Sequence, residues 1–356
     1  MPISAIDAVG PAFQHTKQQL FQPFRAGQWT RLAFVGLLAG ELTTGSCGGF
    51  NRNFRLPRRP NQFAATPTLP HIDPALLVLL ILLLAGLAFI FWILLIYVNS
   101  VMRFILFDSV LEKNCEIGKG WSRRQPHGLK FFLWQIAYTL VTFMGIAILI
   151  GIPVMLAFAA GWLTKPKEHT AALILCGIAL FLVGLVYVLA AAVVLVFTKD
   201  FVIPQMALEN LSAFQAWERL LPMLGAEKGA YFGYVLLKVV MTIAVGIVLG
   251  IVTMLVILLA LIPVGGLSVV AVLMGKGVGL QWNVYTITLA VVIGFILLMI
   301  LLYIVSLIGV PAIVFFPAYA IYFFASRYPA LGAMINPGVP GVPVAPMMPN
   351  APYQPE

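Results

Sequence analysis

Charged residues are scarce in this sequence, and their scarcity excludes most soluble folds. Only 9% of the 356 residues are Asp, Glu, Lys or Arg, whereas 62% are hydrophobic. An ordinary soluble domain carries about 25% charged residues. A fold in water could not bury so much apolar surface, so we expect lipid to be the solvent for most of the chain.

Cysteine and histidine are too few and too scattered for a disulfide framework or a metal site. The three cysteines, Cys47, Cys115 and Cys176, lie far apart, and an odd count without a close pair argues against both. The four histidines form no His-x-x-His or Glu-x-x-His pair. We therefore expect neither a metal ion nor a cofactor.

Catalytic motifs are missing as well. The sequence has no Gly-x-Ser-x-Gly, and the glycines at 275–279 lack the spacing of a phosphate-binding loop. The sequence therefore predicts a protein that is not an enzyme. Its net charge of +9 is spread over several loops, which favours membrane topology and headgroup attraction over nucleic-acid binding.

Long apolar runs are what the sequence has in abundance, and each predicts a transmembrane helix. The six runs are 29–42, 75–99, 131–162, 171–198, 231–264 and 286–316. A spanning helix needs about 20 residues, so the first run, interrupted by Arg31 and Glu41, is the weakest. We expect an all-α, multi-pass integral membrane protein with six transmembrane helices.

The domain boundaries follow from the runs. Residues 1–28 are expected to form an amphipathic segment on the cytoplasmic face. Residues 29–328 form the six-helix transmembrane domain. Residues 329–356, rich in Pro, Gly and Met, are expected to be a disordered tail.

The stretch 199–221 separates the fourth and fifth runs and holds the clearest local signals. Pro204 should kink or end the preceding helix, and Ser212 with Gln215 has the form of a capping box that starts a new one. Apolar residues at steps of three and four, Trp217 among them, predict an amphipathic helix at the headgroup boundary. The alternative is a short helix packed on its own neighbours.

Related stretches recur in the chain. Residues 104–121 align with 201–217 with one gap, which pairs Glu112 with Glu209 and Trp121 with Trp217. Chance self-alignment of apolar sequence is the alternative, but the shared Glu and Trp weigh against it. We assign these residues and Pro204 a structural role at the membrane interface.

These correspondences predict three repeated units. They cover about 8–107, 112–204 and 207–317, and each consists of an interfacial amphipathic helix followed by a transmembrane hairpin. Internal repeats of this kind are common in membrane transport folds.

The motifs Asp-Phe-Val-Ile-Pro at 200–204 and Ser-Ala-x-x-Ala-Trp at 212–217 carry a resemblance. The pattern resembles a broad group of uncharacterised bacterial polytopic membrane proteins. This group includes the membrane domain associated with glycerophosphodiester phosphodiesterases. The resemblance would cover about 8–328, and a bacterial inner membrane would suit the distribution of positive charge. The catalytic domain of those relatives is absent here, so no activity is implied.

The distribution of Lys and Arg predicts orientation. With six spans and the N-terminus inside, the cytoplasmic side holds 13 and the other side 7. If the first run does not span, each side holds 10. The positive-inside rule therefore favours six spans in the cell membrane with both termini cytoplasmic.

Four residues within the spans are candidates for ligand binding. Lys238 is ionisable and lies inside a span, which makes it a functional candidate. We expect its ammonium to reach the cytoplasmic headgroups by snorkelling. Pro153, Pro263 and Pro311 interrupt three spans; broken helices can bind substrates, although such prolines more often shape packing.

Taken together, the sequence predicts a non-enzymatic membrane protein that organises the membrane or binds lipid, a membrane-protein partner or further copies of itself. The alternative is a small-solute or lipid transporter with a polar path between the three hairpins. The spans contain few polar residues, which argues against that alternative.

Overall fold

A computed structural model describes residues 3–41, 74–163, 167–277 and 284–335, and every regular element in these ranges is helical. The elements in chain order are α1 (Val9–Phe21), α2 (Ala26–Leu38), α4 (Pro74–Leu111), α5 (Ile117–Ala159), α6 (Thr170–Phe197), the π-helical turn η1 (Thr198–Val202), α7 (Ile203–Glu209), α8 (Ala213–Ala226), α9 (Lys228–Gly277), α10 (Val284–Ala325) and α11 (Pro329–Ile335). The expected all-α fold class is confirmed.

Long apolar helices dominate the fold because a helix satisfies its own backbone hydrogen bonds, as lipid requires. In the described ranges, five are long and apolar enough to cross a membrane. They are Ala75–Leu111, Ile117–Ala159, Thr170–Glu209, Lys228–Ile262 and Val291–Ala325. The expectation of a membrane protein is supported, but the sixth predicted span is not among them.

The missing span is the apolar run 29–42. Its helix, α2, has 13 residues and is therefore about 20 Å long, whereas the hydrocarbon core of a bilayer is about 30 Å thick. It packs instead against α4 and α10. Gly36 permits the close approach to α10, because a Cβ atom there would lie 2.5 Å from Cδ1 of Ile313.

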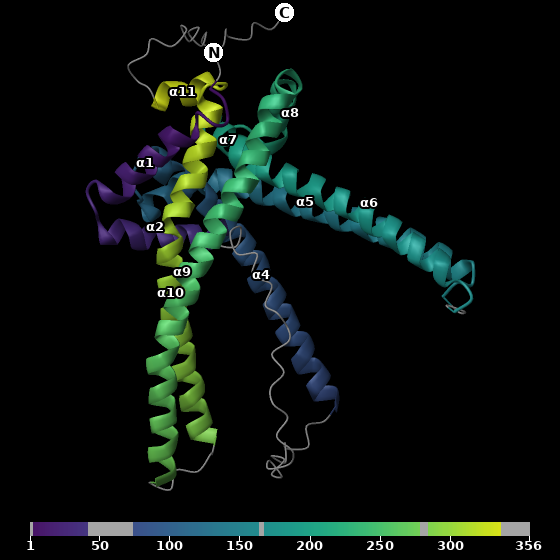
Figure 1. The fold of residues 1–356 in the computed structure, drawn as a ribbon, viewed down its shortest axis with the longest axis vertical. Helices are drawn as coiled ribbons and strands as arrows, with labels where there is room; N and C mark the ends of the chain where they lie inside the picture. The colour runs from purple at the N-terminus through teal and green to yellow at the C-terminus, as the bar shows by residue number, and fades with distance from the viewer. Residues whose placement is uncertain (1–2, 42–73, 164–166, 278–283, 336–356) are drawn as a thin grey trace, which may run out of the picture.

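The helices diverge from one common end of the molecule, which we call the base (Figure 1). The base consists of α1, α2, α7, α8 and α11 with the adjoining ends of the five long helices. Three legs leave it: α4 alone, the hairpin of α5 and α6, and the hairpin of α9 and α10. α2 thus lies in the base, whereas α4 begins at the far end of its leg.

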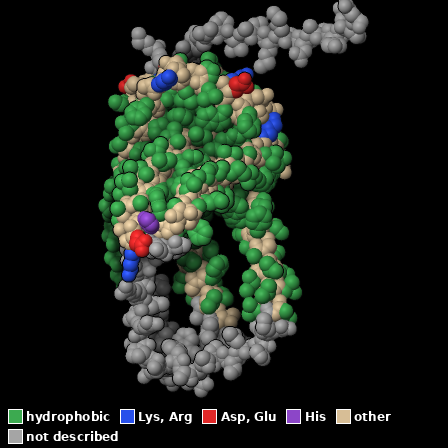
Figure 2. Space-filling view, turned by 90° about the vertical axis from the view of Figure 1, so that its right-hand side faces the viewer, with side chains coloured by type: hydrophobic (Ala, Val, Ile, Leu, Met, Phe, Trp, Pro, Cys, Tyr) green, Lys and Arg blue, Asp and Glu red, His purple; other side chains and the backbone are tan. Residues whose placement is uncertain are grey.

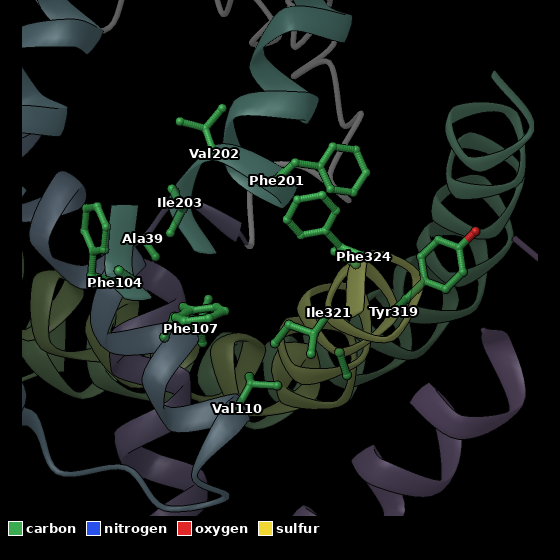
Figure 3. Packing of buried hydrophobic residues seen from close by; sticks show 14 of the residues in the cluster. Ala39, Phe104, Phe107, Val110, Phe201, Val202, Ile203, Tyr319, Ile321 and Phe324 are labelled. Carbon is green, nitrogen blue, oxygen red and sulfur yellow. The ribbon is translucent and has the colours of Figure 1, made fainter. Parts of the chain in front are cut away.

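The buried core lies in the base. Its centre is a set of stacked and edge-on aromatic rings from η1, α9 and α10. The ring of Phe201 lies 5.1 Å from those of Tyr234 and Phe324, and Tyr234 lies 4.9 Å from Tyr319. Figure 3 shows Phe201 and Phe324 facing each other. The core therefore joins the α5–α6 hairpin to the α9–α10 hairpin at the ends that lie in the base.

The legs, in contrast, expose their apolar side chains. On α4, large hydrophobic residues from Leu76 to Leu95 are exposed, and buried residues begin at Ser100. Figure 2 shows hydrophobic side chains over most of the visible surface, with charged ones at the top of the view and in one small group at the left. Exposed apolar helices of this length require lipid around the legs.

The three predicted units differ in their helices. In the third unit α8 is a separate helix, and both hydrogen bonds of the predicted capping box between Ser212 and Gln215 are present. In the second, the segment with Trp121 runs without a break into the long helix α5, so no separate interfacial helix precedes that span. In the first, α2 is too short to complete a transmembrane hairpin.

One local correspondence between the units is nevertheless visible in the backbone. Lys113 and Asn210, which directly follow the aligned residues Glu112 and Glu209, have φ angles of 55° and 56°. Both positions are therefore left-handed turns that end one helix and lead into the next.

The C-terminal boundary also differs from the expected one. Residues 329–335, placed in the disordered tail by the sequence, form α11, and Leu331 is fully buried. The remainder of that predicted tail, 336–356, lies outside the described residues.

Candidate functional site

A cluster of buried charged residues lies where α4, η1, α9 and the residues after α2 meet. The π-helical turn η1 carries two of its members, Lys199 and Asp200. The turn precedes Pro204, which has no N–H to offer the carbonyl of Asp200 in an α-helix. The predicted kink at Pro204 is thus a widened turn, and the helix continues through it to Glu209. π-helical turns occur frequently at functional sites.

Asp200 forms the inner ion pair of the cluster. Its Oδ2 accepts a hydrogen bond of 2.5 Å from Nζ of Lys238 and one of 2.9 Å from the hydroxyl of Tyr234. The side chains of Lys238 and Asp200 are 15% and 8% exposed. The ammonium of Lys238 is therefore held in an ion pair with Asp200, a partner that the snorkelling interpretation did not include.

Lys199 and Arg103 form the outer part of the cluster with Glu41. Nζ of Lys199 lies 3.3 Å from Oε1 of Glu41. Nε of Arg103 donates to the carbonyl of Ala39 at 3.3 Å, and its guanidinium lies over the ring of Phe131 at 5.8 Å. These groups come from segments that are far apart in the sequence.

The electrostatic balance of the cluster is positive. A small cavity of about 50 Å³ lies between these groups, and its described lining holds three cations and two carboxylates: Glu41, Arg103, Lys199, Asp200 and Lys238. Burial alone would raise the pKa of the Glu41 carboxyl, but the charges of Lys199, Arg103 and Lys238 outweigh this effect and hold its pKa below the usual value. Glu41 is therefore a carboxylate.

A larger groove opens beside the cavity, between α2, α4, α5 and α6. Its volume is about 570 Å³, which is within the usual range of about 300–1,000 Å³ for ligand pockets. The walls are mainly apolar and aromatic, and Trp92, Trp134 and Tyr138 contribute the largest rings. Arg103 and Lys199 line both the groove and the small cavity, so the groove has one charged end.

The proline candidates do not converge on this site. Pro153 lies in α5 and Pro311 in α10, both half-buried, and neither lines the cavity or the groove. Pro263 lies in α9, in a part whose side chains are outside the described residues. Two other prolines line the small cavity, Pro204 and Pro317.

Five residues were assigned to the membrane interface, and besides Pro204 the other four also lie in the base. Glu112 pairs with Arg123, with 3.1 Å between Oε1 and Nη2. The ring of Trp121 packs edge-on against Tyr97 at 6.2 Å. Glu112 and Trp121 thus contribute to the joint between α4 and α5.

Glu209 and Trp217 belong to the neighbouring turn between α7 and α8. Glu209 pairs with Arg219 and accepts a hydrogen bond of 2.5 Å from the hydroxyl of Tyr328. Trp217 is half-buried and packs against the core. These contacts connect α7, α8 and the segment before α11.

Sequence reasoning missed four members of the cluster, Glu41 among them, and one buried ion pair. Arg103, Lys199 and Asp200 stand at the ends of apolar runs, where a charged residue usually faces headgroups. Arg124 is 7% exposed and donates to both carboxylate oxygens of Asp108 at 2.6 Å. One feature could have indicated these residues other than Glu41 in advance: each lies within a helix that continues beyond its apolar run.

Fold and site together define an all-helical membrane protein with a buried charged cluster at one end of an amphipathic groove. The chain matches the Family of unknown function (DUF7544) over residues 3–334 and belongs to it. That match supplies no link to the membrane domain associated with glycerophosphodiester phosphodiesterases. No curated protein matches the chain, and no solved structure does. Among the residues with described positions, no group of three His, Cys, Asp or Glu could hold a metal ion.

Proposed function

We propose that this protein is a non-enzymatic integral membrane protein that binds lipid in the groove between α2, α4, α5 and α6. The observation that carries the proposal is the lining of that groove, which is mainly apolar and aromatic, with some uncharged polar side chains, and is positively charged at one end. A membrane lipid has the same division between acyl chain and headgroup. A lipid is also the most abundant ligand beside an exposed leg.

The distribution of Lys and Arg residues favours a base on the cytoplasmic side. α1 and α11 both lie in the base (Figure 1). The segments that meet there contain the 13 Lys and Arg residues counted for the cytoplasmic side, although α2 does not span. We therefore retain the cell membrane as the location, with the base on the cytoplasmic face. The apolar legs would contact bulk lipid, a membrane-protein partner or a second copy of the chain.

Lipid retention by the purified protein tests the binding function. Thr139 lines the groove, whereas its neighbour Leu140 on α5 is 62% exposed and does not line it. Thr139→Trp should fill the groove and reduce lipid retention in native mass spectrometry from a mild detergent. Leu140→Trp, the matched control, should leave retention unchanged. Equal retention in all three proteins would contradict the proposed site.

Lipid transport is the second candidate function, and the charged cluster favours it. Ionisable residues inside spans mark substrate and ion pathways in transporters. Lys199 and Asp200 lie on a π-helical turn, an element that can rearrange. Flipping of a fluorescent lipid in proteoliposomes separates the candidates: flipping that depends on the protein supports transport, and binding without flipping supports the binding function.

A further inference from the structure

We propose that the groove selects a lipid with a net negative phosphate headgroup, held by Arg103 and Lys199. This inference rests on the proposed lipid-binding function and names the class of lipid. A purely apolar binding site could not select lipids by the charge of their headgroup. Four observations support it: the charge balance, the hydrogen-bond donors that face the groove, the depth of the cluster and the internal carboxylate.

The charge balance leaves one cation in excess. Asp200 is committed to Lys238 and Tyr234 through two hydrogen bonds. Of the described residues that line the small cavity, this leaves Glu41 as the single carboxylate for both Arg103 and Lys199. A positive charge in a low-dielectric site is costly unless it is paired. A headgroup with one net negative charge would complete the pairing.

The donors that face the groove suit a phosphate. A guanidinium has five N–H donors, and in the described part of the chain Arg103 uses one of them, in the bond from Nε to Ala39. Packing over Phe131 holds the plane of the guanidinium. Lys199, with its side chain 21% exposed, adds an ammonium that contacts Glu41 at 3.3 Å. Arg binds phosphate oxygens through two parallel hydrogen bonds, and Lys binds them as a point charge.

The depth of the cluster matches the headgroup layer. The exposed hydrophobic residues of α4 run from Leu76 to Leu95, a rise of about 30 Å, which equals the hydrocarbon thickness. Arg103 follows two turns later, just beyond that boundary. On α4 the groove extends from Arg103 back to Trp92, about 16 Å along the helix axis. A lipid with its phosphate at Arg103 would thus place an acyl chain along the aromatic wall.

Glu41 has the position of an internal competitor. Its carboxylate contacts Lys199 at 3.3 Å, and the nearby charges of Lys199 and Arg103 hold its pKa below the usual value. A lipid phosphate would share Lys199 with it or displace it. Removing the charge of Glu41 should therefore strengthen lipid binding, which is opposite in sign to the effect of removing Arg103 or Lys199.

The experiment measures how tightly the purified, full-length protein binds phosphatidylglycerol and phosphatidylcholine. The two lipids have identical acyl chains, and each is titrated and followed by native mass spectrometry. We expect the wild type to bind phosphatidylglycerol about tenfold more tightly, the effect of one charge-assisted hydrogen bond. Arg103→Gln and Lys199→Gln should each abolish this preference while binding of phosphatidylcholine remains. Glu41→Gln should increase it. Lys119→Gln, at a side chain that is 86% exposed, is the charge-matched control and should change nothing.

The failures of the two proposals can be distinguished. Equal binding of both lipids by the wild type would overturn the headgroup assignment while lipid binding stands. Binding of neither lipid would overturn the proposed function itself. Complete displacement of phosphatidylglycerol by millimolar inorganic phosphate would assign the cations to a soluble anion instead, and no displacement supports the lipid. Size-exclusion chromatography checks that Arg103→Gln and Lys199→Gln are folded. If both folded variants keep the preference for phosphatidylglycerol, the assignment is also overturned.

Discussion

The guanidinium of Arg124 and the carboxylate of Asp108 form a two-bond ion pair inside the base, with both N–O distances at 2.6 Å. Nη1 of Arg124 also donates to the carbonyl of Ala207 at 2.6 Å. One side chain on α5 therefore connects α4 with α7. This joint holds together the ends of two legs, and the groove lined by α2, α4, α5 and α6 lies between the same legs.

Breaking this joint should destabilise the protein. Arg124→Ala leaves the carboxylate of Asp108 buried without its bidentate partner, and we expect the free energy of unfolding to fall by about 3–5 kcal/mol. Arg123→Ala is the control, because Arg123 is 57% exposed and its pairs should contribute less than about 1 kcal/mol. Thermal unfolding in detergent measures both. Equal losses in the two variants would contradict the structural role of Arg124.

The buried pair of Lys238 and Asp200 predicts a compensating double variant. Lys238→Met removes the cation and leaves Asp200 with the hydroxyl of Tyr234 alone, so stability should fall by about 3–5 kcal/mol. The combination Lys238→Met and Asp200→Asn removes both charges and should recover most of the loss. Thermal unfolding of the four proteins forms a double-mutant cycle. If Lys238→Met alone were neutral, snorkelling would be the correct description after all.

His15 makes stability depend on pH. Burial lowers the pKa of its imidazole from the usual value of 6.5, and Nε2 lies 2.8 Å from the carbonyl of Val110. The unfolded chain therefore binds the proton more readily than the folded one. The contribution of His15 to the free energy of unfolding is fully present above about pH 6.5. It is lost as the pH falls through the lowered pKa of the folded state.

The measurement for His15 is the unfolding temperature between pH 7.5 and pH 5 in detergent. We expect a decrease in the wild type and a smaller decrease in His15→Gln, which has no proton to gain. The difference between the two curves isolates His15 from the other titrating groups. Identical curves would show that His15 does not contribute.

The close packing of α2 predicts opposite effects at two glycines of the same helix. At Gly36 a Cβ atom would lie 2.5 Å from Ile313, so Gly36→Ala should cost about 1–3 kcal/mol. At Gly27 no heavy atom lies within 4 Å of that position, and Gly27→Ala should be neutral or stabilise by up to about 1 kcal/mol. Thermal unfolding in detergent reports both. If neither Gly36→Ala nor Gly27→Ala changed the stability, the close packing of α2 against α10 would be contradicted.

The orientation can be checked by labelling single cysteines with an impermeant maleimide, after removal of the native ones. Lys119→Cys on α5 and Phe214→Cys on α8 are exposed in the base and should react from the cytoplasmic side. Lys167→Cys, between α5 and α6 at the far end of their hairpin, should react from the opposite side. Reaction of Lys119→Cys and Phe214→Cys from different sides would refute a common base.

Much of the fold could be read from local sequence. The length and apolar character of the runs predicted the helices, and the Ser212–Gln215 motif located the start of α8. These features depend only on neighbouring residues, because helix capping and the amphipathic repeat act within a few turns. The apolar composition alone determined that lipid is the solvent of the legs.

The site could not be read in the same way, since its partners are remote in the sequence. Glu41 and Lys199 are separated by 158 positions, and Asp200 and Lys238 by 38. Glu41, Lys199 and Asp200, seen alone at the ends of apolar runs, have the pattern of headgroup contacts, and Lys238 has the pattern of a snorkelling lysine. Only the convergence of the helix ends in the base turns them into a buried network.

The composition and the periodicity of the chain thus determined its solvent, its secondary structure and most of its spans. The tertiary structure decided that α2 remains in the base, that Lys238 pairs with Asp200 and that Arg103 faces a groove. The physical reason is that hydrophobic periodicity constrains which face of a helix is buried, whereas ion pairs and cavities depend on which helices meet and at what depth.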